Sequence, residues 1–195
     1  MQEKSERSMA SLYLNKIVLK TEAAPLMHEL ATRFNATSYL GVLENNEVMY
    51  LERAEQFNSL RLYTQIGKRE PLHCTALGKV LMSALPEAEF ERKARNLPYT
   101  RYTDKTLTRY EDFAEEVAIV RANGYALDRG EHVEGSSCLA VPIYDYTRNL
   151  IAAMSISGYG LLDNYPEEVL YDSMREAAVE LSTRMGYTKP DNDKA

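Results

Sequence analysis

The stretch 124–145, GYALDRGEHVEGSSCLAVPIYD, constrains the fold more than any other part of the 195-residue chain. The amphipathic pattern before it stops at Gly124, as a helix does when a glycine follows its last turn. A dense polar loop comes next, and then an apolar run, 138–144, that is typical of a buried strand. The stretch therefore predicts a helix end, a polar loop and a buried strand in direct succession.

The rest of the chain alternates short runs of β-forming residues with amphipathic helical patterns. The Asn45-Asn46 pair between two such runs predicts a hairpin. The predicted strands cover residues 37–44, 47–55, 60–66, 139–144 and 150–157. The predicted helices cover residues 21–34, 76–84, 86–96, 110–123 and 166–185. Three strands, then helices, then a second hairpin indicate an α+β fold with a mostly antiparallel sheet.

Helix ends are predicted by capping residues. Thr21 is expected to cap the first helix, with Pro25 in its first turn. Thr108 and Glu111 have the spacing of a capping box, which predicts the start of the helix that ends at Gly124. The short run 12–20 is compatible with either a helix or a strand.

Composition excludes several classes of protein. The apolar fraction is 45% and the charged fraction 27%, values typical of an ordinary globular domain. No apolar run approaches the roughly 20 residues needed to span a bilayer, and the N-terminus lacks the pattern of a secretion signal. The net charge is −6 with scattered basic residues, so this chain is not expected to bind nucleic acid itself. The two cysteines are expected to be free thiols in a reducing cytoplasm.

The segment 71–79, PLHCTALGK, leads into a predicted helix. The backbone N–H groups of Ala76, Leu77 and Gly78 belong to its first turn, where they lack intrahelical acceptors and form a potential anion site. The alternative interpretation is that Thr75 only caps the helix and Gly78 is small for packing.

Two other places offer polar groups beside apolar strands. Asp128, expected at the start of a strand, can accept a hydrogen bond from a ligand hydroxyl or cap a turn. Ser155 and Ser157 are two residues apart and therefore point to one face of their strand. They can bond across the sheet or line a polar pocket.

Cys138 has three interpretations. A free cysteine entering an apolar strand is usually a buried hydrophobic residue. It becomes a nucleophile only if His73 or His132 lies within hydrogen-bond reach. A metal site made of Cys138, Asp128 and His73 would have no characteristic spacing.

The same stretch resembles the signature of the IclR family of bacterial transcription regulators. The matching positions are Gly124, Asp128, Glu131, Cys138-Leu139-Ala140 and Ile143-Tyr144-Asp145. The resemblance is to the family's C-terminal effector-binding domain, which implies a GAF-like or profilin-like fold with a curved sheet and helices packed on it. It implies a sensor without catalysis, metal or cofactor, and segment 60–83 looks similar to the branch that senses sugar acids such as 2-keto-3-deoxygluconate.

The resemblance also assigns a site for the effector. The amides of Ala76 and Leu77 are expected to meet its carboxylate, and Asp128 to bond a hydroxyl or hydrated carbonyl at the opposite end. The remaining pocket residues that it implies are Cys138, Ser155 and Ser157, with His73, Leu62, Glu70 and Ser136 as further candidates. Glu70 departs from the apolar residue usual there, which leaves the polarity of the rim open.

Members of the family carry an N-terminal winged helix-turn-helix domain, which we do not expect any segment of this sequence to supply. We expect residues 1–20 to be a linker or disordered remnant, 21–188 the effector-binding domain and 189–195 a disordered tail. The implied protein is a homodimeric or homotetrameric repressor that reaches DNA only through the missing domain. The alternative, from a different class, is a small cysteine-dependent hydrolase that uses Cys138 with His73 or His132.

Overall fold

The structure is a computed structural model that describes residues 2–55 and 66–189, with side chains from residue 15 onward. Nearly all of the predicted strand 60–66, including Leu62, and all but the first residue of the predicted tail 189–195 lie outside the described residues. The division into linker, domain and tail stays a prediction.

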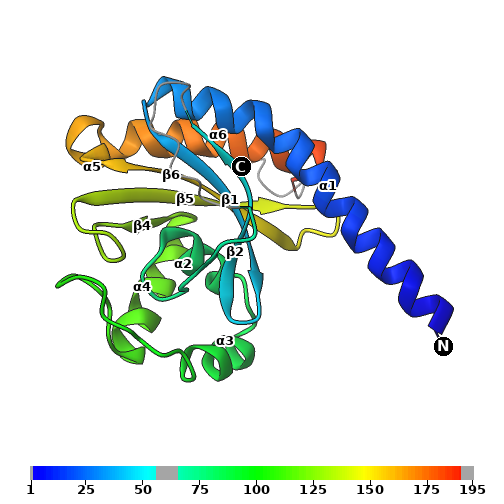
Figure 1. Cartoon of the computed structure of the whole chain (residues 1–195), viewed down its shortest axis with the longest axis horizontal. Coiled ribbons are helices and arrows are strands. Elements are labelled where there is room, and N and C mark those ends of the chain that lie inside the picture. The colour runs from blue at the N-terminus through cyan, green and yellow to red at the C-terminus, as the bar shows by residue number, and fades with distance from the viewer. Residues whose placement is uncertain (1, 56–65, 190–195) are drawn as a thin grey trace.

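A six-stranded antiparallel sheet in the order β3-β2-β1-β6-β5-β4 forms the centre of the molecule (Figure 1). Its strands are β1 Thr37–Glu44, β2 Glu47–Ala54, β3 Arg69–Glu70, β4 Ala126–Asp128, β5 Ser136–Tyr144 and β6 Leu150–Tyr159. Both predicted hairpins, β1–β2 and β5–β6, are confirmed. Asn45 and Asn46 turn the first with φ of 52° and 63°, the left-handed region that asparagine tolerates.

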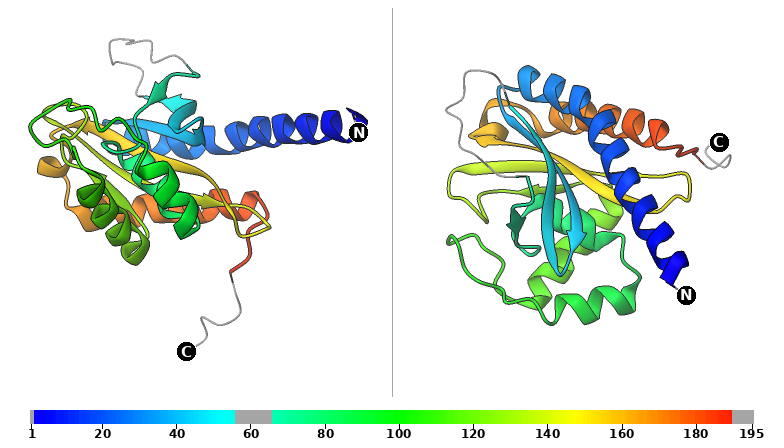
Figure 2. Two further views of the ribbon diagram at one scale, coloured as in Figure 1. Left: turned by 90° about the horizontal axis from the view of Figure 1, so that it is seen from below. Right: turned by 45° about the vertical axis from the view of Figure 1, so that its right-hand side comes forward.

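Helices cover both faces of this sheet, which confirms the α+β fold. They are α1 Gln2–Arg33, α2 Ala76–Ser83, α3 Glu87–Ala94, α4 Tyr110–Asn123, α5 Leu161–Asn164 and α6 Glu167–Arg184. Helices α1 and α6 lie side by side on one face, whereas α2, α3 and α4 lie on the other (Figures 1 and 2). Each side has its own core, built around residues such as Met27 and Met174 on the first and Phe90 and Phe113 on the second.

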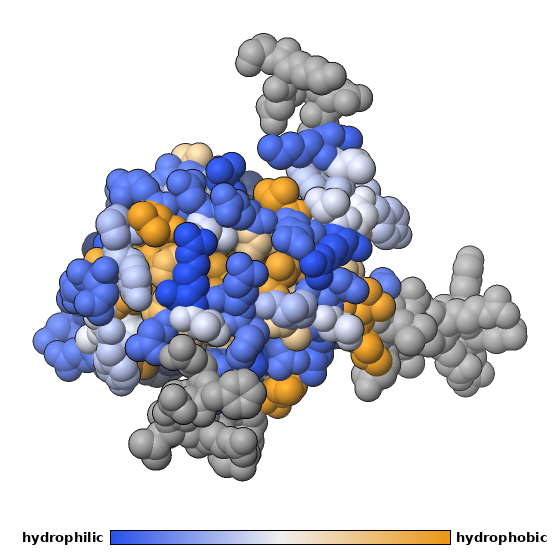
Figure 3. Space-filling view, turned by 90° about the horizontal axis from the view of Figure 1, so that it is seen from above, coloured by the Kyte–Doolittle hydropathy of each residue, from blue (hydrophilic) through white to orange (hydrophobic). Residues whose placement is uncertain are grey.

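The outer face over α1 and α6 shows hydrophobic patches interspersed with hydrophilic side chains (Figure 3). The N-terminal part of α1 extends beyond the body of the molecule (Figures 1 and 2). No described helix combines the length and apolarity that a membrane span requires.

Three predicted boundaries are wrong. The first helix begins at Gln2 rather than Thr21, whose hydroxyl donates to the Ile17 carbonyl 3.0 Å away inside the helix. Helix α4 has Arg109, not Thr108, at its N-cap, and no side chain caps it, so the capping box does not form. Asp128 ends a short strand instead of starting one. In each case the local sequence is compatible with the predicted boundary, but the helix or strand begins or ends at a different residue in the folded chain.

Candidate functional site

The register of the sheet aligns the predicted strand residues in one row. Asp128 pairs with Cys138, Cys138 with Ser157, and Ser157 with Thr37, across strands β4, β5, β6 and β1. Directly paired residues of neighbouring strands point to the same face, so these four side chains share one face. Ser155 lies two residues before Ser157 and faces the same way.

The N-terminus of α2 opens onto this row. Thr75 caps it, since its Oγ1 accepts from Gly78 N at 3.1 Å and donates to the Pro71 carbonyl at 2.7 Å. The amides of Ala76 and Leu77 have no acceptor within the helix. The first turn carries no acidic side chain. The positive end of the helix is therefore unneutralised there.

Gly78 is required by a close approach of two backbone segments. A Cβ built at this position would lie 2.3 Å from the Leu72 carbonyl oxygen and 2.5 Å from the Leu72 Cα. The interpretation that Thr75 caps the helix and Gly78 is small for packing is confirmed. The anion site at the amides of Ala76 and Leu77 stays a prediction.

A cavity of about 520 Å³ lies between this helix end and the sheet. Its lining includes the six residues assigned first from the sequence, Ala76, Leu77, Asp128, Cys138, Ser155 and Ser157, together with Glu70 and Ser136. His73 does not line it; its Nε2 lies 3.0 Å from the Thr100 carbonyl and its ring packs against Tyr99. Expecting His73 at the cavity was wrong, because the ring turns toward the loop after α3.

Asp128 is 3% exposed and closes a turn with one of its oxygens. Its Oδ1 accepts from Gly130 N at 3.0 Å and Glu131 N at 2.7 Å. Burial raises the pKa of this carboxyl, an effect opposed by the hydrogen bond from Glu131 N and by the charge of Lys79. The turn interpretation is confirmed, and the same residue lines the cavity.

A buried cation supports the loop that carries Asp128. Lys79 Nζ, on α2, donates to Glu131 Oε1 at 2.6 Å, to the Leu127 carbonyl at 2.9 Å and to Glu116 Oε2 at 3.0 Å. The lysine side chain is fully buried. Helix α2 and the loop after β4 are thereby joined through one ammonium group, a link that sequence reasoning missed.

The thiol of Cys138 is not activated. Its Sγ donates to Ser157 Oγ at 2.9 Å, and desolvation, with the charge of Asp128, raises its pKa to about 12. His132 Nε2 lies 3.3 Å from Glu70 Oε2. No histidine of the described chain is hydrogen-bonded to this thiol, and no three His, Cys, Asp or Glu side chains there group as metal ligands.

Two tyrosines of the lining were missed. Tyr39 and Tyr50 stack with ring centroids 4.7 Å apart, and the Arg53 guanidinium lies over the Tyr39 ring at 5.9 Å. Burial is the main cause that raises the pKa of Tyr50. Each tyrosine lies in a run of β-forming residues that predicts a strand. Side chains alternate between the two faces of a strand, but the sequence does not show which face meets a cavity.

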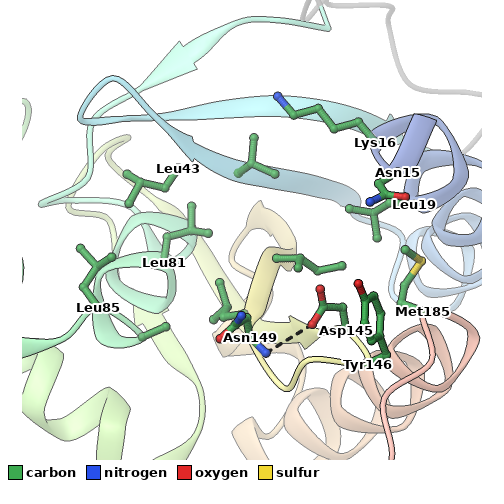
Figure 4. Close-up of a pocket in the computed structure, with 14 residues that line it drawn as sticks. Asn15, Lys16, Leu19, Leu43, Leu81, Leu85, Asp145, Tyr146, Asn149 and Met185 are labelled. Atoms are coloured by element: carbon green, nitrogen blue, oxygen red, sulfur yellow. Dashed lines mark hydrogen bonds between the residues drawn. The ribbon is translucent and has the colours of Figure 1, made fainter. Parts of the chain in front are cut away.

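A second cavity of about 580 Å³ lies under α1 (Figure 4). Its wall is mostly aliphatic, with Leu43, Leu81 and Leu85 on one side (Figure 4). Asp145, one of its few charged residues, already accepts from Thr147 and Asn149 with Oδ1. The smaller cavity is the better candidate, because free amides, hydroxyls and carboxylates converge only there among the described residues.

Comparison with known proteins gives a consistent result. The family model described as "Bacterial transcriptional regulator IclR C-terminal" matches residues 11–183. The HTH-type transcriptional regulator XynR of Escherichia coli K12 is 34% identical over 175 residues, which are 89% of this chain and 69% of XynR.

Solved structures agree. The C-terminal domain of the E. coli regulator KdgR superposes with a TM-score of 0.76 at 32% identity, covering 87% of this chain and 99% of that domain. An IclR homologue from Microbacterium hydrocarbonoxydans in complex with 4-hydroxybenzoate has a TM-score of 0.77 at 28% identity, over 89% of this chain and 70% of that one.

Proposed function

The chain belongs to the IclR family of bacterial transcriptional regulators, as its C-terminal effector-binding domain, and we propose that its polar cavity binds a small organic or sugar acid. One observation carries this proposal. The unneutralised N-terminus of α2 and the row of polar side chains on the sheet line the same cavity.

The effector's carboxylate is placed at the amides of Ala76 and Leu77. A helix N-terminus favours an anion through its free N–H groups and its dipole. Asp128 is placed at the other end, since a carboxylate beside a bound carboxylate would repel it. Ser155 and Ser157 bond the polar groups in between, and Cys138 forms part of the wall.

The size of the cavity supports an acid of several carbons. At roughly 30 Å³ for a water-sized group, about 520 Å³ exceeds the need of a two-carbon acid. An IclR homologue solved with 4-hydroxybenzoate is a neighbour of this fold. A ring or a C5–C6 chain is thus an appropriate size for the ligand.

Binding acts on DNA indirectly in this proposal. The effector shifts the population between two arrangements of a homodimer or homotetramer, and the shift changes the DNA affinity of a separate domain. The regulator works in the cytoplasm as a repressor, and the effector leaves unchanged.

Isothermal titration calorimetry tests the proposal. The purified chain is titrated with 2-oxo acids, sugar acids and aromatic acids, and at least one acid is expected to bind at micromolar to millimolar concentration. Asp128→Asn and Ser155→Ala are each expected to weaken binding about tenfold or less, as loss of one hydrogen bond does. Ser173→Ala, a buried serine on α6, is the matched control.

Two results would contradict the proposal. Failure of every acid to bind folded protein would remove the pocket assignment, and unchanged affinity in both variants would remove the residue assignment. Turnover of a bound acid would favour the hydrolase alternative.

A further inference from the structure

Glu70 brings a second carboxylate into the cavity. It ends the short edge strand β3 and is 7% exposed. Lys68 Nζ lies 2.6 Å from its Oε1, and His132 Nε2 lies 3.3 Å from its Oε2. The Lys68 side chain is half exposed, so solvent screens its charge, whereas the carboxylate lies in the wall.

Two hydroxyls of the same wall are without partners. In the described part of the chain, neither the Tyr50 hydroxyl nor the Ser155 hydroxyl has a hydrogen-bond partner, although both residues line the cavity. Ser155 is 3% exposed. Both hydroxyls are therefore free to pair with a ligand or with water in the cavity.

Glu70, Asp128 and Tyr50 line the same cavity. Besides burial, the charges of both carboxylates raise the pKa of the tyrosine. The Tyr50 hydroxyl is therefore within electrostatic range of both acids and stays protonated at neutral pH. A ligand in this cavity therefore meets two carboxylates and a protonated tyrosine hydroxyl in its wall.

We propose that Glu70 and Tyr50 are specificity-determining residues, which select acids that carry several hydroxyls and only one carboxylate. This inference rests on the proposed function, because it assumes that an acid occupies the cavity with its carboxylate at α2. Ligand hydroxyls can donate hydrogen bonds to the carboxylates of Glu70 and Asp128. They can also donate to, or accept from, the hydroxyls of Tyr50 and Ser155.

Other acids fit this wall less well. A second carboxylate near Glu70 meets a like charge in a partly desolvated site. A chain without hydroxyls offers no partner to the Tyr50 and Ser155 hydroxyls and no further donor to the two carboxylates, so it loses these hydrogen bonds.

The test uses matched pairs of probes that differ only at the far end of the chain. Gluconate, galactonate and mannonate are each compared with the corresponding dicarboxylate, glucarate, galactarate and mannarate, and with hexanoate, by calorimetry. At least one monocarboxylate is expected to bind about tenfold or more tighter than its dicarboxylate and than hexanoate.

Two variants assign the selectivity to residues. Glu70→Gln keeps the size of the side chain and removes its charge, so the preference for the monocarboxylate is expected to shrink about tenfold. Tyr50→Phe removes one hydroxyl and is expected to weaken monocarboxylate binding about 2- to 10-fold. Glu89→Gln, at a partly exposed residue on α3, makes the same charge change away from the cavity. It is expected to alter neither the preference for the monocarboxylate nor the affinity.

The outcomes separate the two proposals. If an acid binds but the dicarboxylates or hexanoate bind as tightly as the monocarboxylates, the inference is overturned and the proposed function stands. An unchanged preference in Glu70→Gln together with unchanged affinity in Tyr50→Phe overturns it equally. If none of these acids, 2-oxo acids or aromatic acids binds, both fail.

Discussion

Lys79 Nζ lies 2.6 Å from Glu131 Oε1 in a site where the lysine side chain is fully buried and the glutamate side chain is 10% exposed. The pair joins α2, which offers the amides of the cavity, to the loop that carries Asp128. The other oxygen of Glu131, Oε2, is buried without a partner in the described chain. The carboxylate therefore depends on one ammonium group for its compensation.

Replacing that ammonium should destabilise the fold. Lys79→Met leaves a buried carboxylate without its cation, and the expected loss is about 3–5 kcal/mol in the free energy of unfolding. Urea denaturation measures it. The double variant Lys79→Met/Glu131→Gln should recover part of the loss. Lys93→Met, whose ammonium reaches only an exposed Asn46, is the control, and a loss no larger than the control's would refute this account.

The cap of α2 gives a second prediction. Thr75→Val removes the hydroxyl that accepts from Gly78 N, whereas Thr75→Ser keeps it. We expect the valine variant to lose about 0.5–2 kcal/mol of stability and the serine variant clearly less. Thermal unfolding followed by circular dichroism distinguishes them, and equal losses would contradict the expectation, because the methyl group would then contribute as much as the cap.

The close approach of Gly78 to Leu72 leads to a third prediction. Gly78→Ala places a Cβ 2.3 Å from the Leu72 carbonyl oxygen, so backbone must move. The expected cost is about 1–3 kcal/mol, with weaker acid binding because the amides of α2 are displaced. Gly158→Ala is the control for stability alone, since its nearest contact would be an ordinary 3.6 Å but the residue lines the cavity. Equal melting temperatures for the two variants would contradict the expectation.

Asp128 should make stability depend on pH. Burial raises the pKa of its carboxyl above the ordinary 3.8, so the folded protein holds the proton to higher pH than the unfolded chain. The contribution of Asp128 to the free energy of unfolding therefore falls as the pH rises from about 3.8 through the pKa of the folded state. Asp128→Asn should gain stability relative to wild type over that window in urea denaturation. Fully exposed Asp104→Asn should not, and the opposite slope would refute the assignment.

Both thiols should react slowly in the folded protein. The pKa of Cys138 rises from 9.0 to about 12, which lowers its thiolate fraction at neutral pH about a thousandfold. Burial also raises the pKa of Cys74 well above its usual range. Labelling by iodoacetamide, followed by mass spectrometry, should be at least about 100-fold slower than in urea. Rapid labelling of native Cys138 would favour the thiol-enzyme alternative instead.

Much of the fold was predictable because local signals agreed with tertiary packing. The helix of residues 110–123 stops at Gly124, which has a φ of 79° that suits glycine. The Asn45-Asn46 turn and the two hairpins follow from turn chemistry and β-forming runs. The start of α1 was missed because residues 2–20 have no strong helix signal of their own.

Some residues of the candidate site were predictable from the sequence and others were not. Ala76 and Leu77 were identifiable because a helix start always leaves its first amides without acceptors, and Ser155 and Ser157 because residues two apart share a face. Tyr50 was not identifiable, since alternation along a strand does not show which of its two faces meets a cavity. His73 was assigned wrongly, because sequence does not give the direction of a loop side chain.

The sequence by itself determined the order of most elements and the polar residues that strands β4 to β6 present. It took the tertiary structure to show that Tyr39 and Tyr50 line the same cavity as Glu70 and that Lys79 ties α2 to the Asp128 loop. Periodicity and capping depend on residues a few positions apart, so a short segment of sequence is enough to predict them. Lys79 and Glu131 are 52 positions apart, and only packing of the whole chain brings such groups within hydrogen-bond distance.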